Sequence, residues 1–313
     1  MTDRLPETGW PPPVLDPAGP YSEPVTTLAW ALLIGGTVVF AIVLAALWIA
    51  LRGSPKLKTQ LGGEKAIWIL GFAFPSVVLT GLLVWGLMLT SSLSATRIPE
   101  GAMRVKIIGE MWWWRVHYQD GRGRETLRDA NELHIPVGTP VLLELEAADV
   151  IHSFWVPRLG GKMDMIPGRT NRLLIEADAP GVYKGQCAEY CGGPHALMGF
   201  VVVAHSPEDF ARWRASRVPA GGGGAGLALF LSSGCAACHT IRGTPANGLA
   251  GPDLTHVGSR RTLGAGILPN NPGTMAGWIA DAQAIKPANR MPAYHQFDAA
   301  ELGALTDYMV SLK

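Results

Sequence analysis

The chain has 313 residues, of which 16% are charged, and its formal net charge at pH 7 is +1. This length is enough for about two domains, and a charge so close to zero excludes a strongly basic surface of the kind that binds nucleic acid. The mean hydropathy of +0.19 is high for a wholly soluble protein, so membrane-spanning segments are expected.

All four cysteines fall in two short motifs. Cys187 and Cys191 stand four residues apart, and Cys235 and Cys238 stand three apart. Because both spacings are typical of metal or cofactor sites, none of the four is left over for a structural disulfide. The cysteines therefore indicate cofactors, and the compartment has to be inferred from the membrane segments.

The N-terminal segment, residues 1–24, predicts an irregular arm. It is rich in proline, with three in a row at residues 11–13. It has neither the charged-then-apolar pattern of a signal peptide nor a lipoprotein cysteine, so we interpret it as an arm outside the membrane.

Two long uncharged segments follow the arm. Pro24–Leu51 and Ala66–Thr96 carry no charged residue over 28 and 31 positions, whereas about 20 apolar residues are enough to cross a bilayer. A buried core helix is seldom so long. Residues 25–96 therefore predict a transmembrane hairpin, with helices at about 25–51 and 66–91.

The loop between the two spans sets the predicted topology. It carries four basic residues against the single acidic Glu64. By the positive-inside rule this loop is cytoplasmic. Both chain termini, and every domain after the second span, are then expected on the periplasmic or external side of a bacterial inner membrane.

Residues 97–205 show the period-two alternation of half-buried β-strands. Glycine and proline separate the strands, as in the stretches 136–140 and 180–181. The pattern predicts a Greek-key β-sandwich with functional loops at one end. The alternating apolar positions are Val105, Ile107, Trp112, Trp114, Val116, Tyr118, Val141, Leu143 and Leu145.

A dense set of soft metal ligands lies in the sequence Q-C-A-E-Y-C-G-G-P-H-A-L-M. Cys187, Cys191, His195 and Met198 form the pattern C-x3-C-x3-H-x2-M. Thiolate, imidazole and thioether are the ligands that copper selects. The second thiolate suggests two sulfurs that bridge two copper ions, and His152 in V-I-H-S-F-W is the candidate for a second histidine.

Two other interpretations of this loop remain open. A disulfide between the two cysteines is possible on the oxidising side of a membrane, but it leaves His195 and Met198 without a role. A zinc site is possible too, although its usual ligands are cysteine, histidine and carboxylate, not methionine. Copper accounts for all four residues.

Residues 206–224 separate this region from a second soluble domain at 225–313. A short helix is possible at 206–217, but Pro219 and the four glycines at 221–224 cannot pack a core. We interpret the segment as a flexible linker. Such a tether would let the second domain swing relative to the rest of the chain.

The second domain carries the haem c attachment motif C-A-A-C-H. Cys235 and Cys238 would form thioethers to the haem, and His239 would be the proximal iron ligand. A thioredoxin-like dithiol is the alternative, but no βαβ pattern surrounds the motif. Met291, followed by a proline, is the expected sixth ligand, with Met275 as its rival. Histidine–methionine ligation raises the potential of the iron, as electron transfer requires.

The copper loop, together with the segment His152–Arg169, resembles subunit II of cytochrome c oxidase and its binuclear copper-A site. The resemblance covers Val25 to about His205. With the haem motif added, the chain resembles the caa3-type oxidases, whose subunit II ends in a cytochrome c domain. This implies a two-helix transmembrane hairpin, a cupredoxin-like Greek-key β-sandwich and an all-α class I cytochrome c domain.

The resemblance implies roles for further residues. Trp112 aligns with the first aromatic residue of a run that lies over the copper site and accepts electrons from the donor. Glu189 would offer its backbone carbonyl to one copper and its side chain to a magnesium ion shared with subunit I. Family members often have a glutamate where this chain has Lys65, so a role of Glu64 in proton uptake stays open.

The implied function is electron delivery within a haem-copper terminal oxidase. Electrons from a cytochrome c-type or other high-potential donor would pass through haem c to copper A. They would continue to subunit I, with its haem a and copper B, for the reduction of oxygen to water with proton pumping. Subunit III is a further expected partner.

Two other functions stay open. One is the small subunit of a copper-A nitric oxide reductase, which the active-site metal of the partner subunit would distinguish. The other is a non-catalytic, membrane-tethered electron carrier or copper-handling protein. Copurification with a haem a subunit would exclude this alternative.

Overall fold

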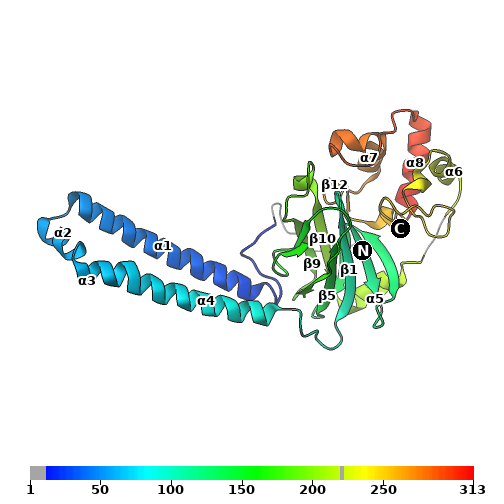
Figure 1. The fold of residues 1–313 in the computed structure, drawn as a ribbon. Coiled ribbons are helices and arrows are strands. Elements are labelled where there is room, and N and C mark those ends of the chain that lie inside the picture. The colour runs from blue at the N-terminus through cyan, green and yellow to red at the C-terminus, as the bar shows by residue number, and fades with distance from the viewer. Residues whose placement is uncertain (1–11, 219–221) are drawn as a thin grey trace. The chain divides into compact units, whose positions relative to one another are not determined.

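The computed structural model describes residues 12–218 and 222–313, which divide into two compact units. One unit is Glu23–Thr96 and is helical. The other comprises the described residues before Glu23 together with Arg97–Lys313, and it contains all the strands (Figure 1).

The helical unit contains two helices that are long and apolar enough to cross a membrane. They span Glu23–Arg52 and Glu64–Leu93, each with 30 residues, and no residue of their apolar windows is buried. At about 1.5 Å per residue either exceeds the roughly 30 Å of a bilayer core. Exposed apolar side chains are expected where lipid, not protein, surrounds a helix. The segments are α1 (Glu23–Arg52), α2 (Pro55–Leu61), α3 (Glu64–Ala66), the π-helical η1 (Ile67–Ala73) and α4 (Phe74–Leu93).

The second span contains a proline and an irregular turn. Pro75 lies in the first turn of α4, directly after the π-helical segment η1. Proline supplies no backbone N–H to the preceding turn, and a π-helical turn is one way in which a helix accommodates a break in its hydrogen bonding.

The second unit contains a β-sandwich of two five-stranded sheets. The first has the order β3-β2-β1-β5-β8 and the second β4-β10-β9-β6-β7. The pairs β1–β5 and β4–β10 are parallel, whereas the other pairs are antiparallel. The strands are β1 (Met103–Glu110), β2 (Trp113–Gln119), β3 (Glu125–Ala130), β4 (Glu132–Pro136), β5 (Val141–Ala147), β6 (His152–Trp155), β7 (Met163–Met165), β8 (Asn171–Ile175), β9 (Gly181–Cys187) and β10 (Gly199–His205).

The sandwich core confirms the predicted alternation. Val105 and Ile107 of β1 are fully buried, and so are Trp114 and Val116 of β2. The Trp114 indole donates a hydrogen bond to the carbonyl of Gly199 (2.9 Å), which satisfies its one polar atom. A buried tryptophan thus ties the first sheet to the second, next to the loop that follows β9.

A short helix closes the end of the sandwich. Helix α5 (Pro207–Ala215) begins after Ser206, whose hydroxyl accepts a hydrogen bond from the Asp209 amide. Its Trp213 belongs to the sandwich core and stacks on His134 with ring centroids 4.2 Å apart. Half of the predicted linker is therefore helical and packed, because one large aromatic side chain anchors it.

The stack around Trp213 predicts a pH-dependent stability. Burial, and after it the electrostatic effect of His134, lowers the pKa of His205 from 6.5 to about 4. The unfolded chain therefore binds more protons between these values, so stability should be lost as pH falls from about 6.5 to 4. Thermal unfolding followed from pH 7 to 4 tests this. His205→Gln, which cannot titrate, should show a weaker dependence, and identical profiles would contradict the assignment.

The C-terminal part of the second unit is helical. The helices are α6 (Ala225–Ser232), η3 (Cys235–Ala237), η4 (Val257–Ser259), α7 (Pro272–Ile285) and α8 (Ala299–Ser311), with the short strands β11 (Thr262–Leu263) and β12 (Leu268–Pro269). A capping box formed by Asp298 and Glu301 opens α8. Helices α6 and α8 pack closely, since a Cβ on Gly226 would lie 2.4 Å from that of Tyr308.

Candidate metal and haem sites

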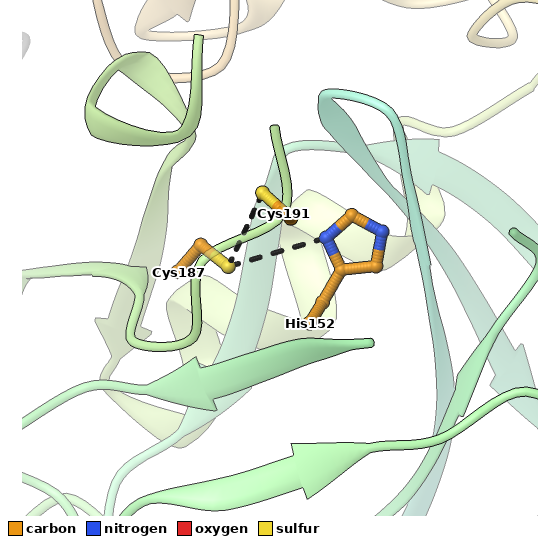
Figure 2. A group of neighbouring side chains, drawn as sticks. All are labelled: His152, Cys187 and Cys191. Atoms are coloured by element: carbon orange, nitrogen blue, oxygen red, sulfur yellow. Dashed lines mark hydrogen bonds between the residues drawn. The ribbon is translucent and has the colours of Figure 1, made fainter. Parts of the chain in front are cut away.

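Three of the expected copper ligands form one buried cluster. The sulfur of Cys187 lies 3.8 Å from that of Cys191 and 4.0 Å from Nδ1 of His152 (Figure 2). The three ligand atoms all lie within 4.8 Å of one another. A disulfide would bring the sulfurs to about 2.05 Å, so the pair is an open dithiol.

The other expected ligands surround the same two sulfurs. Nδ1 of His195 lies 3.6 Å from the Cys191 sulfur, and the Met198 thioether lies 3.8 Å from it. On the opposite side the carbonyl of Glu189 lies 3.2 Å from the Cys187 sulfur. All six residues expected from the sequence therefore contribute an atom to one site.

Sheet pairing explains why residues so far apart in the chain meet. Strand β6 begins at His152 and β9 ends at Cys187, and the two strands pair next to each other. The Cys187 amide also donates to the carbonyl of Met198 (2.8 Å), which closes the loop into a compact turn. Gly109 makes room for the imidazole, because a Cβ there would lie 2.9 Å from the His152 ring.

The donor set fits a pair of copper ions better than the alternatives. A metal–sulfur bond is about 2.3 Å long, so sulfurs 3.8 Å apart can both contact an ion on either side of the line that joins them. Two thiolates, two imidazoles, a thioether and a carbonyl exceed what one tetrahedral zinc ion takes. The soft character of the set suits copper.

The pKa values of the two thiols are shifted in opposite directions. Hydrogen bonding with Cys191 is the main cause that lowers the pKa of Cys187, to about 3, with further help from His152. The same contact raises the pKa of Cys191. Cys187 is therefore the thiol that ionises more readily, and a thiolate is the form that a metal ion requires.

Asp149 is a residue of the site that sequence reasoning did not assign. Its carboxylate accepts a hydrogen bond from Nε2 of His152 (3.0 Å) and another from the amide of Met111 (2.9 Å). It thereby holds the ring so that Nδ1 faces the sulfurs, which is the usual role of a carboxylate behind a metal-binding histidine. The three-residue spacing between Asp149 and His152 gave no usable signal, because spacing in an irregular segment does not determine which side chains meet.

Trp112 is joined directly to the copper loop. Its indole N–H donates to the carbonyl of Cys191 (2.8 Å). The neighbouring Gly192 has a φ of 114°, and a Cβ there would lie 3.0 Å from the indole, so only glycine lets the ring lie this close. Strand β2 begins at Trp113, which leaves Trp112 in the turn before it.

The C-terminal domain contains a cavity of about 390 Å³ that is lined by the residues expected to bind haem. Nδ1 of His239 donates to the carbonyl of Pro252 (2.8 Å), which leaves Nε2 for a metal. Gly251 is required beside it, because a Cβ would lie 2.6 Å from the imidazole. The cavity is lined by Cys235, Cys238, His239, Met275 and Met291, with Met111, Trp112 and Trp113 at its border with the sandwich.

The two candidate axial methionines differ in their surroundings. Met275 on α7 is 3% exposed and packs in the core of the domain. Met291 lies in a loop fixed by its backbone, since its amide donates to Asn289 and its carbonyl accepts from Gln283. A methionine with an anchored backbone and a side chain free of the core is better suited to reach an iron ion.

The Glu189 side chain faces away from the sulfurs. It is 43% exposed and lies 3.6 Å from the ammonium of Lys162, which also binds Asp164 (2.7 Å). In this chain a carboxylate pair and a lysine therefore share one surface patch. A magnesium ion at Glu189 would have to compete with that lysine for the carboxylate.

Comparison with known proteins agrees with this architecture. Residues 121–205 match the family profile described as "Cytochrome C oxidase subunit II, periplasmic domain", and residues 224–313 match "Cytochrome c". Cytochrome c oxidase subunit 2 of Alkalihalophilus pseudofirmus is 34% identical, over 96% of this chain and 90% of that one.

Two further relatives have the same description. Cytochrome c oxidase subunit 2 of Bacillus subtilis is 29% identical over 88% of this chain and 83% of its own length. That of Bacillus sp. (strain PS3) is 31% identical over 82% and 77%. The matched domains imply copper A beside the histidine–cysteine cluster and haem c in the C-terminal domain. The chain therefore belongs to the cytochrome c oxidase subunit II family, as a subunit of a haem-copper oxidase with a fused C-terminal cytochrome c domain.

Proposed function

We propose that this subunit accepts electrons at haem c from a cytochrome c-type or other high-potential donor and passes them to a binuclear copper-A site. From there they reach subunit I, where oxygen is reduced to water with proton pumping. The observation that carries the proposal is the border between the two sites. Trp112 and Trp113 line the haem cavity, and the Trp112 indole is bonded to the Cys191 carbonyl.

The proposed ligands follow from the site geometry. Copper A would be held by His152, Cys187, Cys191, His195 and Met198, and by the backbone carbonyl of Glu189. Haem c would be attached through Cys235 and Cys238, with His239 and Met291 on the iron. Because these sets fill the coordination of both metals, this chain moves electrons and leaves oxygen chemistry to its partner.

Further parts of the proposal concern the assembly. Subunit I, with haem a and copper B, and subunit III would be the partners, and the Glu189 carboxylate would bind magnesium at the contact with subunit I. The hairpin would lie in a bacterial inner membrane, with both redox domains on the periplasmic or external side. The proposed domains are an N-terminal arm at 1–24, the transmembrane hairpin at 25–96, the copper-A domain at 97–205 and the cytochrome c domain at 225–313. The linker would be at 206–224.

The proposed order of electron transfer has a kinetic test. After flash reduction of haem c in the purified oxidase, copper A should be reduced in a first-order step whose rate does not change on dilution, because both sites are in one chain. Trp112→Phe keeps an aromatic ring but removes the indole N–H that donates to Cys191, and it should slow this step. A rate that falls in proportion to dilution would show that haem c serves another molecule.

A further inference from the structure

The cytochrome domain is joined to the sandwich by a buried ion pair. Nε of Arg260 lies 2.8 Å from the carboxylate of Asp129 on β3, a residue 131 positions earlier. The two side chains are only 5% and 3% exposed. Arg260 also donates to the carbonyl of Asp253 in its own domain (2.5 Å). A short, fully dehydrated contact of this kind is not typical of a transient encounter, whose charged contacts stay at a wet rim.

A second buried basic side chain crosses the same border. Lys286 is 2% exposed, and its ammonium donates to the carbonyl of Trp112 in the sandwich (2.7 Å) and to that of Gly264 in the cytochrome domain (3.0 Å). It thereby connects the residue at the copper loop with a loop that lines the haem cavity. A buried nitrogen has to be hydrogen-bonded, and these two carbonyls supply its acceptors.

Backbone contacts fix the register of the two surfaces. The amide of Gly199 on β10 donates to the carbonyl of Ala265 (2.8 Å), and that of Arg261 donates to the buried carboxylate of Glu132 (2.9 Å). At Gly199 even a Cβ would lie 2.9 Å from the Ala265 oxygen. The two domains therefore approach to backbone distance at one point, which leaves no room for a sliding contact.

We propose that Asp129, Arg260 and Lys286 lock the cytochrome domain onto the sandwich, so that the haem cavity stays against Trp112. This rests on the proposed function and deepens it: the domain acts as a fixed relay, not as the swinging carrier that the glycine-rich linker predicts. A soluble donor would then meet only the cytochrome domain, because Trp112 and Trp113 are occupied by the chain's own domain.

The linker has to be cut to measure the lock. A tether keeps the two domains at an effective concentration in the millimolar range, which would mask even a large loss of affinity. A protease site placed between Gly222 and Gly224 in the complete oxidase removes this effect. The fraction of the haem-bearing fragment that stays bound on dilution, read from haem-stained gels, then gives its dissociation constant.

The matched variants are Arg260→Gln and Arg290→Gln. Arg290 also faces the sandwich, but its contact with Asp149 is 3.7 Å long and its side chain is 62% exposed. Losing one partner of a buried pair should weaken retention on the order of 100-fold or more. Losing an exposed pair should change it by less than about 5-fold.

Variants in the other domain guard against misfolding. Asp129→Asn leaves the cytochrome domain untouched and should weaken retention as Arg260→Gln does, while Lys286→Met tests the second basic side chain. In each variant the covalent haem content of the uncut protein should be unchanged, and in Asp129→Asn the haem spectrum should be unchanged as well. Because the pair is buried, retention of the wild type should depend only weakly on salt.

The outcomes separate the lock from the proposed function. Release of the wild-type fragment on cleavage, or wild-type retention in Asp129→Asn, would overturn the lock. If haem c still reduced copper A in a first-order step in the uncut oxidase, the proposed function would stand without it. A retained fragment with no electron transfer would leave the lock in place and refute the relay.

Discussion

Replacement of Cys187 by serine should abolish the binuclear copper site. Cys187 contacts three of the other proposed ligands, namely His152, Cys191 and the Glu189 carbonyl, and a hydroxyl is a poor substitute for a bridging thiolate. The copper content of the subunit should fall below two ions, and the mixed-valence electron-spin signal should disappear. Since loss of an outer-shell partner alone costs about 10–100-fold in affinity or activity, electron delivery should fall by at least about 100-fold.

Two milder changes at the same site serve as controls. Met198→Leu removes a thioether on the far side of Cys191 and should alter the reduction potential more than the copper content, because the thioether is a weak ligand. Asp149→Asn keeps every ligand but weakens the hold on the His152 ring, so it should reduce copper affinity without abolishing the signal. Two copper ions and a normal spin signal in Cys187→Ser would refute the bridging role.

The parts of the fold that follow from local chemistry could be predicted from the sequence. A segment in lipid must be uncharged over its whole length, so Pro24–Leu51 and Ala66–Thr96 already indicate the helices found at Glu23–Arg52 and Glu64–Leu93. A strand with one buried face must alternate, and Val105 and Ile107 do so in β1. The π-helical turn before Pro75, by contrast, has no signal in composition.

The proposed ligand residues could also be identified, because five of the six proposed copper ligands lie within twelve residues of chain. The sequence did not show which other residues hold these ligands in position. Asp149 precedes His152 by three residues in a turn, where spacing does not determine which side chains meet. The contact between Trp112 and Cys191 joins positions 79 residues apart. Such pairs depend on how strands stack, which no local pattern encodes.

The junction between the two domains was the largest gap. A run of glycines predicts that the cytochrome domain moves freely relative to the sandwich. The sequence gives no sign of a fixed contact, because Asp129 and Arg260 are ordinary charged residues 131 positions apart. Their burial follows only from the fit of two finished surfaces. Helix α5 also shortens the flexible part of the linker, because Trp213 packs half of the expected linker onto the sandwich.

Replacement of Met291 by alanine should leave haem c attached but change its iron ligation. Cys235 and Cys238 would still hold the haem covalently, so the haem content should not change. Loss of the thioether should remove the methionine–iron charge-transfer band. It should also lower the midpoint potential on the order of 100 mV, as part of the roughly 0.8 V range that axial ligands span. Redox titration followed by visible absorption measures both effects, and electron transfer to copper A should become unfavourable.

Met275→Ala is the matched control, because both methionines line the cavity but only Met275 is part of the buried core. Truncating a core methionine should cost about 2–5 kcal/mol of stability, while the charge-transfer band and the potential stay close to those of the wild type. The reverse pattern, with the band lost in Met275→Ala and kept in Met291→Ala, would exchange the two roles. The haem would then be bound from helix α7, and the loop around Met291 would serve only to close the cavity.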